Sequence, residues 1–419
     1  MRLKSKIRIN STKFILFTIG FTLVALLTAC GGGGAGGNNN LGGANPNTTN
    51  VAGLSACPPG NAIFSIPPVA LANVVGWEPL GHMSPPSHTF PTDHQYLYVA
   101  NPSLNGSLPQ TRPPYPLIAP ANIRVVMIAS GTNSASGTTD YSIYFQTCAD
   151  VAGQFGHVGT LAGPLAALVS TISQHCNIYE PAPGFPVTQC QSGNLLIDIP
   201  AGTQIGTVGD GGSLALDWWL QDRRVLPLHF ANAPRFSVSP DSFDTAHTVG
   251  ASDYFIPSMA SQIAAKVGRF DGAMKRTFLP LGGSIAVDVD ATARGYWFKN
   301  GQPYPPESSH AALVPDYVTP DSVQVFSLGI SQTNVGSRLQ TFVPISSGSV
   351  NRAFETVTAD GNTYCYEFNS NLFFGNAANI ILVQLVNSTT LRIEVSPQFT
   401  RCTAATPYNF SANAVTYQR

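Results

Sequence analysis

Proline and glycine interrupt this chain so often that short strands are favoured over long helices. The 419 residues include 39 glycines and 33 prolines, and the apolar runs between them are short and rich in β-branched residues. Proline removes a backbone hydrogen-bond donor and glycine favours turns, so both divide the chain into short segments. The sequence therefore predicts a mainly β fold with few short helices.

A few segments have clearer signatures. Residues 257–268 have the pattern of a helix, because Pro257 suits its first turn and Gly268 its end. Two apolar runs, 123–128 and 141–147, are joined by a connection of Gly, Thr, Asn and Ser, which predicts a β-hairpin. Strands are also expected within residues 195–222 and over 279–290 and 296–298.

The N-terminus is typical of a bacterial lipoprotein. The first ten residues carry four basic side chains, and an apolar run from Phe14 to Leu27 follows, which is too short to span a bilayer comfortably. The small residues before Cys30 resemble a lipobox, so residues 1–29 are expected to be a signal peptide and Cys30 to carry an N-terminal lipid. An ordinary cleaved signal with an incidental cysteine is the alternative.

A tether is expected to follow the leader. Residues 30–50, which begin with the lipidated Cys30, are rich in Gly and Asn and contain almost no apolar side chains with which to build a core. The protein is then held at the cell envelope by its lipid in the membrane. Gly31, rather than Asp, follows Cys30, which predicts the outer membrane if the cell is Gram-negative.

The remaining length predicts two domains. Without leader and tether, roughly 370 residues remain, more than one compact core normally holds. Residues 315–320 have the character of a linker, so 51–314 and 321–419 are the expected domains. The second domain contains no histidine, which favours binding or packing over chemistry in a small C-terminal all-β domain. Its expected strands cover residues 323–330, 339–343, 363–368, 380–386 and 391–395.

The charge pattern excludes one class of partner. Charged residues make up only 10% of the chain, and the net charge is -1. No basic stripe is present to hold a nucleic acid, so no nucleic-acid partner is expected. A soluble surface must come from the abundant uncharged polar residues.

Six cysteines remain once Cys30 is set aside, an even number in a chain bound for an oxidising compartment. Three disulfides are therefore expected. Zinc ligation by thiolates would need closely spaced cysteines, and no C-x-x-C pattern occurs. Two cysteines bracket a Pro-rich loop and two lie in the C-terminal domain, which gives the expected pairs Cys176 with Cys190, Cys365 with Cys402, and Cys57 with Cys148.

The stretch 81–102 holds three of the eight histidines. Prolines on both sides of His88 prevent a continuous helix, so the stretch is expected to be a loop that enters a strand at residues 95–100. This arrangement brings His82, His88, Asp93 and His94 to the rim of a sheet, where sites are commonly built. Imidazoles and a carboxylate in one loop favour a metal site.

Two further polar residues lie in apolar surroundings. Asp217 and Trp219 would share one face of a strand, and a charged, unpaired carboxylate inside such a strand costs several kcal/mol. Asp217 should therefore have a hydrogen-bond partner, a cation or a metal, unless it lies at a sheet edge. His157 follows a turn at the start of an apolar stretch, and taken alone it is more typical of a structural histidine.

Residues 76–230 resemble the lysostaphin or LytM-type zinc metallopeptidases, which cleave peptide cross-links of bacterial cell walls. The resemblance lies in the order of elements: His94-Gln-Tyr-Leu-Tyr98, then Phe155-Gly-His157-Val, then Pro-Ala-Gly-Thr-Gln-Ile-Gly-Thr-Val-Gly over residues 200–209, then Ala215-Leu-Asp217. The resemblance implies an antiparallel LytM-like core, the duplicated hybrid motif of that family, within residues 51–314.

The resemblance also implies zinc, which those enzymes hold through two histidines and an aspartate. Asp217 takes the place of a metal-binding histidine, Ala215 that of a catalytic one, and Tyr98 that of the aspartate. An oxygen-rich ligand set of this kind is weaker for zinc and could suit other divalent metals. The candidate ligands are His88, Asp93, His94 and Asp217, and His157 matches the auxiliary histidine that stabilises the oxyanion or orients water.

Three functions are compatible with these residues. The favoured hypothesis is a divergent member that binds peptidoglycan peptides or a cell-wall enzyme with weak or no catalysis, because a catalytic histidine is missing. The first alternative is an active metal-dependent peptidoglycan endopeptidase. The second is a surface adhesin or structural lipoprotein, which does not explain the histidine cluster.

Overall fold

The computed structural model describes residues 53–99, 114–133, 137–172, 176–179, 187–210, 213–236, 244–304, 306–330, 336–368, 380–396, 398–399, 401–403 and 407–419. The expected signal peptide, Cys30 and the tether lie outside these ranges. Within them, no helix is both long and apolar enough to cross a membrane. The described part of the chain is mainly antiparallel β, as predicted.

Nine strands form the first sheet, in the order β1-β2-β11-β6-β5-β4-β8-β7, with β9 paired to β4. The predicted hairpin is confirmed as β4 and β5. The strands are β1 (Gly76–Glu78), β2 (Gln95–Tyr98), β4 (Ile123–Asn133), β5 (Thr139–Cys148), β6 (Val151–Val158), β7 (Cys176–Tyr179), β8 (Val187–Ser192), β9 (Ile197–Ile199) and β11 (Ala215–Asp222). A separate pair consists of β3 (Tyr115–Ile118) and β10 (Gln204–Val208).

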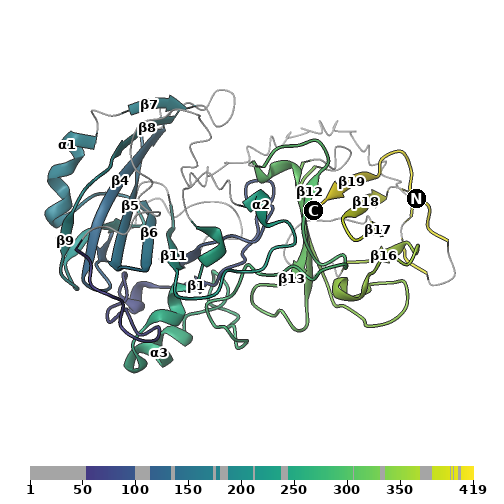
Figure 1. The fold of residues 1–419 in the computed structure, drawn as a ribbon, viewed down its shortest axis with the longest axis horizontal. Coiled ribbons are helices and arrows are strands. Elements are labelled where there is room, and N and C mark those ends of the chain that lie inside the picture. Colours follow the sequence, from purple (N-terminus) through teal and green to yellow (C-terminus); the bar gives the residue numbers. More distant parts are fainter. Residues whose placement is uncertain are drawn as a thin grey trace, which may run out of the picture.

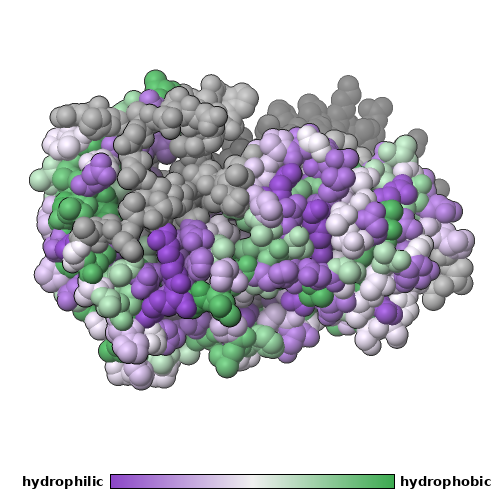
Figure 2. Space-filling model, viewed as in Figure 1, coloured by the Kyte–Doolittle hydropathy of each residue, from purple (hydrophilic) through white to green (hydrophobic). Residues whose placement is uncertain are grey.

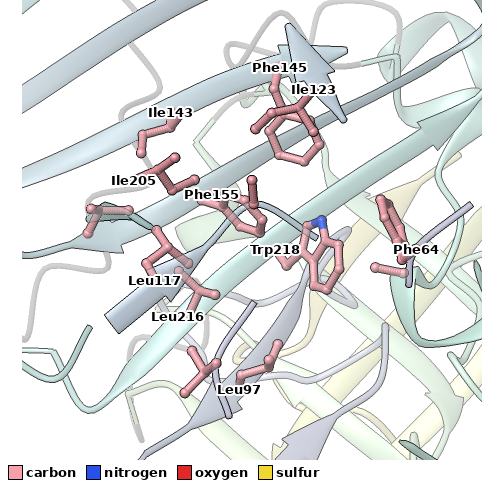
Figure 3. Packing of buried hydrophobic residues seen from close by; sticks show 14 of the residues in the cluster. Phe64, Leu97, Leu117, Ile123, Ile143, Phe145, Phe155, Ile205, Leu216 and Trp218 are labelled. Carbon is pink, nitrogen blue, oxygen red and sulfur yellow. The ribbon is translucent and has the colours of Figure 1, made fainter. Parts of the chain in front are cut away.

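Side chains alternate along β11, as predicted. Leu216, Trp218 and Leu220 belong to the main hydrophobic core, and Figure 3 shows Trp218 among Phe64, Phe155 and their neighbours. Asp217 and Trp219 are buried on the opposite face, outside that core. The strand is buried along its whole length, so its polar side chains need partners within the protein.

Helical elements are short, as expected. The predicted helix is α3 (Pro257–Ala264), which ends four residues before Gly268 because the chain turns to pair with β1 through a Trp77–Val267 bridge. The other α-helices within the described ranges are α1 (Val169–Ile172) and α2 (Ala233–Phe236). The 3-10 turns are η1 (Leu71–Asn73), η2 (Gly163–Leu168), η3 (Thr245–His247), η4 (Ala251–Tyr254), η5 (Glu307–Ser309) and η6 (Phe354–Thr356).

Eight strands form the second sheet, in the order β15-β14-β13-β12-β19-β18-β17-β16. Figure 1 shows the two sheets following each other along the long axis of the molecule. The strands are β12 (Gly295–Lys299), β13 (Ala311–Pro315), β14 (Gln324–Leu328), β15 (Arg338–Phe342), β16 (Tyr364–Tyr366), β17 (Ile380–Asn387), β18 (Thr390–Ser396) and β19 (Val415–Gln418). All five strands predicted in the C-terminal domain are present.

The second sheet begins before the predicted linker. β12 and β13 precede residues 315–320, and they pair in the same sheet as β14 to β19. Asp316 shapes the connection, because its Oδ1 accepts hydrogen bonds from the backbone N–H groups of Val318 and Thr319 at 2.8 and 2.7 Å. The segment expected to separate two domains thus joins neighbouring strands of one sheet.

The strand predicted over residues 279–290 is wrong. This segment consists of turns and irregular backbone, with Gly283 at a φ of +79° and its N–H bonded to the Pro280 carbonyl. Two of its apolar residues, Ile285 and Val287, are nevertheless buried in a cluster with residues of the second sheet, whereas Leu279 is exposed. The apolar content of this segment therefore reflects partial burial and not strand pairing.

Three disulfides form between the predicted partners: Cys57 with Cys148, Cys176 with Cys190, and Cys365 with Cys402. The second bridge joins paired residues of β7 and β8. Figure 2 shows hydrophilic and hydrophobic residues interspersed over the visible face, in keeping with the low content of charged residues.

Candidate functional site

Three adjacent strands bring the candidate residues together. Asp217 lies in β11, between β2 and β6, where it is paired with Tyr96 on one side and with Gly156 on the other. His94 directly precedes β2, and His157 directly follows Gly156 in β6. The two histidines therefore flank Asp217 from opposite neighbouring strands.

The two imidazoles face the same carboxylate oxygen. His157 Nε2 lies 3.3 Å from Asp217 Oδ2, and His94 Nε2 lies 3.7 Å from it. The opposite nitrogen of each ring faces another carboxylate: His157 Nδ1 is 2.5 Å from Asp140 Oδ2, and His94 Nδ1 is 3.1 Å from Asp93 Oδ1. The five side chains form a continuous row, Asp140, His157, Asp217, His94 and Asp93, which we call the His–Asp row.

Aromatic side chains hold one end of this row. The rings of Trp219 and Tyr96 lie 4.0 and 4.7 Å from the His94 ring, measured between centroids. Trp219 Nε1 also donates a hydrogen bond of 2.9 Å to Asp93 Oδ1. Asp93 thus orients His94 and is itself fixed by Trp219.

The backbone at the other end of the row is unusual. His157 has a φ of +57°, which is uncommon for a residue with a side chain, and it lies where the register between β5 and β6 shifts. A bulge of this kind redirects a side chain and locally disrupts pairing. Left-handed backbone at a non-glycine residue costs of order 1–3 kcal/mol and concentrates at functional sites. Here it directs the imidazole between Asp140 and Asp217.

Asp217 is only 1% exposed, and its Oδ1 has no hydrogen-bond partner. Burial raises the pKa of this carboxyl, and Asp140 adds to the rise, while His157 and His94 oppose it. A buried oxygen without a partner is costly, so this atom is where a bound cation or a proton would be most strongly stabilised.

His88 lies beside the row. Its ring centroid is 5.6 Å from that of His94, and its Nε2 is buried without a hydrogen-bond partner. Burial lowers the pKa of His88 well below its usual value, and the neighbouring His94, His82 and His157 lower it further. A neutral imidazole with an unused nitrogen is the form that can bind a metal.

His82 belongs to a different pair. Its Nδ1 lies 3.0 Å from Glu78 Oε2, and the Tyr317 hydroxyl donates a hydrogen bond to the same carboxylate. Burial lowers the pKa of His82, but Glu78 outweighs this effect and the pKa is raised overall. This histidine therefore holds a carboxylate from β1 and takes no part in the row.

The sequence singled out His88, Asp93, His94, His157 and Asp217, and the fold brings all five into one neighbourhood. Asp93 orients His94, where the prediction made it a ligand. Asp140 was missed, because the pairing that brings it to His157, with Tyr141 opposite Val158, lies at a register shift between β5 and β6 that residue order does not show.

The distances within the His–Asp row match those of a metal site in part. Ligand atoms about 2.0–2.1 Å from a tetrahedral zinc lie roughly 3.3–3.4 Å apart, close to the 3.3 Å between His157 Nε2 and Asp217 Oδ2. The 3.7 Å at His94 is longer, and as the side chains lie no group of three or more His, Cys, Asp or Glu among the described residues could hold a metal ion. A metal would have to draw His94 towards Asp217.

Comparisons with family models, curated proteins and solved structures found no match for this chain. The LytM resemblance therefore stays a prediction, and the site rests on its own geometry.

Proposed function

We propose that this is a cell-envelope lipoprotein that binds a divalent metal, zinc foremost, and that recognises cell-wall peptides with weak or no hydrolysis. His94 Nε2, His157 Nε2 and an Asp217 oxygen would be the ligands, with His88 available as a fourth. Asp93 and Asp140 would orient the two histidines. When bound, zinc would supply a Lewis acid and an acidified water.

One observation carries the metal proposal: both histidines present Nε2 to the same aspartate while a carboxylate holds each Nδ1. Metal-ligating histidines almost always donate their other ring N–H to a carboxylate, carbonyl or water, which fixes the tautomer and the ring orientation. Packing alone does not require two such pairs to converge on one buried carboxylate. The unpartnered Oδ1 of Asp217 adds to this support.

The wall-peptide part of the proposal is supported by sequence. The lipobox-like residues before Cys30 favour the envelope, with an outer-membrane anchor if the cell is Gram-negative. The order of elements in residues 76–230 favours peptidoglycan or a cell-wall enzyme as the partner.

Weak or absent catalysis is favoured by two features. Ala215 stands where the resembled family has a catalytic histidine, and an alanine can neither move a proton nor donate to an oxyanion. Asp217 and His94 are only 1% and 4% exposed, so a scissile peptide has little access to them.

An active metal-dependent endopeptidase is the second candidate. The carrying observation is His88, whose buried Nε2 has no hydrogen-bond partner and whose ring lies beside His94, where it could serve as a general base. Release of peptides from purified peptidoglycan would favour this candidate over binding alone.

Metal analysis of the purified protein tests the proposal. We expect about one zinc per chain, lost on Asp217→Ala or His157→Gln substitution. His229→Gln is the matched control, because His229 Nε2 also lies 3.0 Å from an aspartate, Asp290, but in an exposed pair. A correctly folded wild-type protein that binds no zinc, cobalt or manganese would contradict the proposal.

A further inference from the structure

The loop that carries the histidines is shaped by its own backbone. Residues 81–94, here called the histidine loop, fold back on themselves: Gly81 N–H bonds to the Thr92 carbonyl at 3.0 Å, and Thr92 N–H to the His82 carbonyl at 2.9 Å. Ser84 and His88 exchange backbone hydrogen bonds of 2.8 and 3.0 Å. The loop is thus a small hairpin held by its own backbone hydrogen bonds.

Phe90, between His88 and His94, anchors this loop in the second sheet. The Phe90 side chain is 2% exposed, and its ring lies nearly parallel to that of His310, with centroids 5.6 Å apart. Tyr296 and Phe298 of β12 meet the same ring edge-on at 4.9 and 5.2 Å. Edge-to-face and offset aromatic pairs of this kind stabilise a fold by more than the burial of their surface alone.

Glu307 adds a polar contact next to this ring. Its Oε2 accepts a hydrogen bond of 2.9 Å from the Phe90 backbone N–H, across 217 residues of sequence. Glu307 begins η5, which is fixed to the end of β14, because Ile330 N–H bonds to the Ser308 carbonyl at 2.7 Å and Gly329 N–H to the His310 carbonyl at 2.9 Å. The carboxylate is therefore presented from a rigid support.

His310 completes the set of side chains around Phe90, and its ring is neutral. Its Nδ1 accepts a hydrogen bond from the Lys299 N–H at 3.0 Å, which leaves Nε2 to donate to the Pro303 carbonyl at 3.1 Å. Both nitrogens are thus used within the second sheet and its connections. The ring is held flat against Phe90 and has no nitrogen left for the His–Asp row.

We propose that Glu307 and Phe90 are positioning residues for the metal site, and that the second sheet sets the metal affinity of a site built on the first. This inference rests on the proposed metal site. Phe90 is two residues from His88 and four from His94, a span short enough to carry a displacement from one to the other. Mutation of an outer-shell residue that orients a metal ligand commonly changes metal affinity 10- to 100-fold. Glu307 and Phe90 act on the ligands only through the loop backbone, so we expect an effect at the lower end of that range.

The test compares three variants of the full chain. Glu307→Ala removes the acceptor for the Phe90 N–H, whereas Glu307→Gln keeps an oxygen in the same place. The control is Glu394→Ala: Glu394 lies in β18 of the same sheet and accepts two hydrogen bonds of 2.7 Å from Ser411, so it matches Glu307 as a carboxylate that holds a loop. Zinc affinity is measured by competition with a chromophoric chelator, well below the unfolding temperature.

We expect Glu307→Ala to weaken zinc binding about tenfold, with Glu307→Gln restoring most of the affinity and Glu394→Ala leaving it unchanged. Equal affinities in Glu307→Ala and wild type would overturn the inference. So would a loss in Glu394→Ala as large as in Glu307→Ala, because the effect would then be general loss of stability.

Failure of the metal proposal can be distinguished from failure of the positioning inference. If the wild type binds no zinc, amide hydrogen exchange over residues 82–94 decides the positioning role, since this readout needs no metal. Faster exchange there in Glu307→Ala than in both wild type and Glu394→Ala supports it. Unchanged exchange in that segment overturns it.

Discussion

At the residue scale, the site depends on how single side chains are aimed. His157 reaches Asp217 because its backbone adopts a left-handed conformation at a bulge, and Asp140 holds the other side of its ring. The sequence indicated His157 through the resemblance, but a shift in register between β5 and β6 cannot be read from residue order. Asp140 therefore looked like an ordinary acidic residue at the start of a strand.

The Asp140–His157 contact leads to a prediction. Replacing Asp140 with Ala removes the carboxylate that orients the imidazole and raises its basicity, so we expect zinc affinity to fall roughly 10- to 100-fold. Asp244→Ala is the control, because Asp244 Oδ2 lies 2.7 Å from His247 Nδ1 in a comparable pair that is not part of the row. Chelator competition measures both variants, and equal zinc affinities in the two would contradict the assigned role of Asp140.

At the element scale, local patterns predicted well what is determined locally. The β4–β5 hairpin, the alternation along β11 and the proline at the start of α3 follow from neighbouring residues. Features set by distant partners were missed: residues 315–320 look like a linker, but β12 and β13 before them pair with strands after them. The His–Asp row falls between these cases. Most of its members can be recognised in the sequence, but the distances between them depend on β2, β11 and β6 being neighbours.

The disulfides lead to a prediction at the same scale. Cys57 and Cys148 are 91 residues apart, whereas Cys176 and Cys190 are 14 apart. In the chain-entropy model the longer loop constrains the unfolded chain more, by about 4.6 against about 3.0 kcal/mol. We expect the double alanine variant of the first pair to lose roughly 1.6 kcal/mol more unfolding free energy than that of the second, measured in urea under oxidising conditions. Equal losses would show that strain or residual structure outweighs loop length.

At the scale of the whole molecule, the two sheets are joined by a mixed apolar and polar contact. Leu80, Met83 and Phe90, from the segment between β1 and β2, pack with Tyr296 and Phe298 of β12. The Tyr317 hydroxyl donates a hydrogen bond to Glu78 of β1. β12, which lies within the predicted first domain of residues 51–314, belongs to the second sheet, and through it that sheet supports the loop that carries the candidate site. Patterns within each segment could not show this, because the contacts join residues more than 200 positions apart.

His310, within this contact, gives the molecule a pH-dependent stability. Burial lowers its pKa from 6.5 to about 4, and the side chain is 0% exposed. The folded protein holds the neutral ring, so between these two values the unfolded chain binds more protons. The stabilisation is complete above pH 6.5 and is lost as the pH falls towards 4. From pH 7 to pH 4.5 this one group should lower the unfolding free energy by about 2.5 kcal/mol.

The comparison of wild type with His310→Gln isolates this contribution. Glutamine has a donor and an acceptor for the Pro303 carbonyl and the Lys299 N–H, but it does not titrate. Urea unfolding at pH 7 and pH 4.5 should show a fall in stability that is about 2.5 kcal/mol smaller in the variant, even if the variant is less stable at pH 7. Because acidic groups elsewhere titrate in both proteins, their effects cancel in the difference. Parallel losses would mean that His310 is protonated in the folded protein, which its two backbone hydrogen bonds oppose.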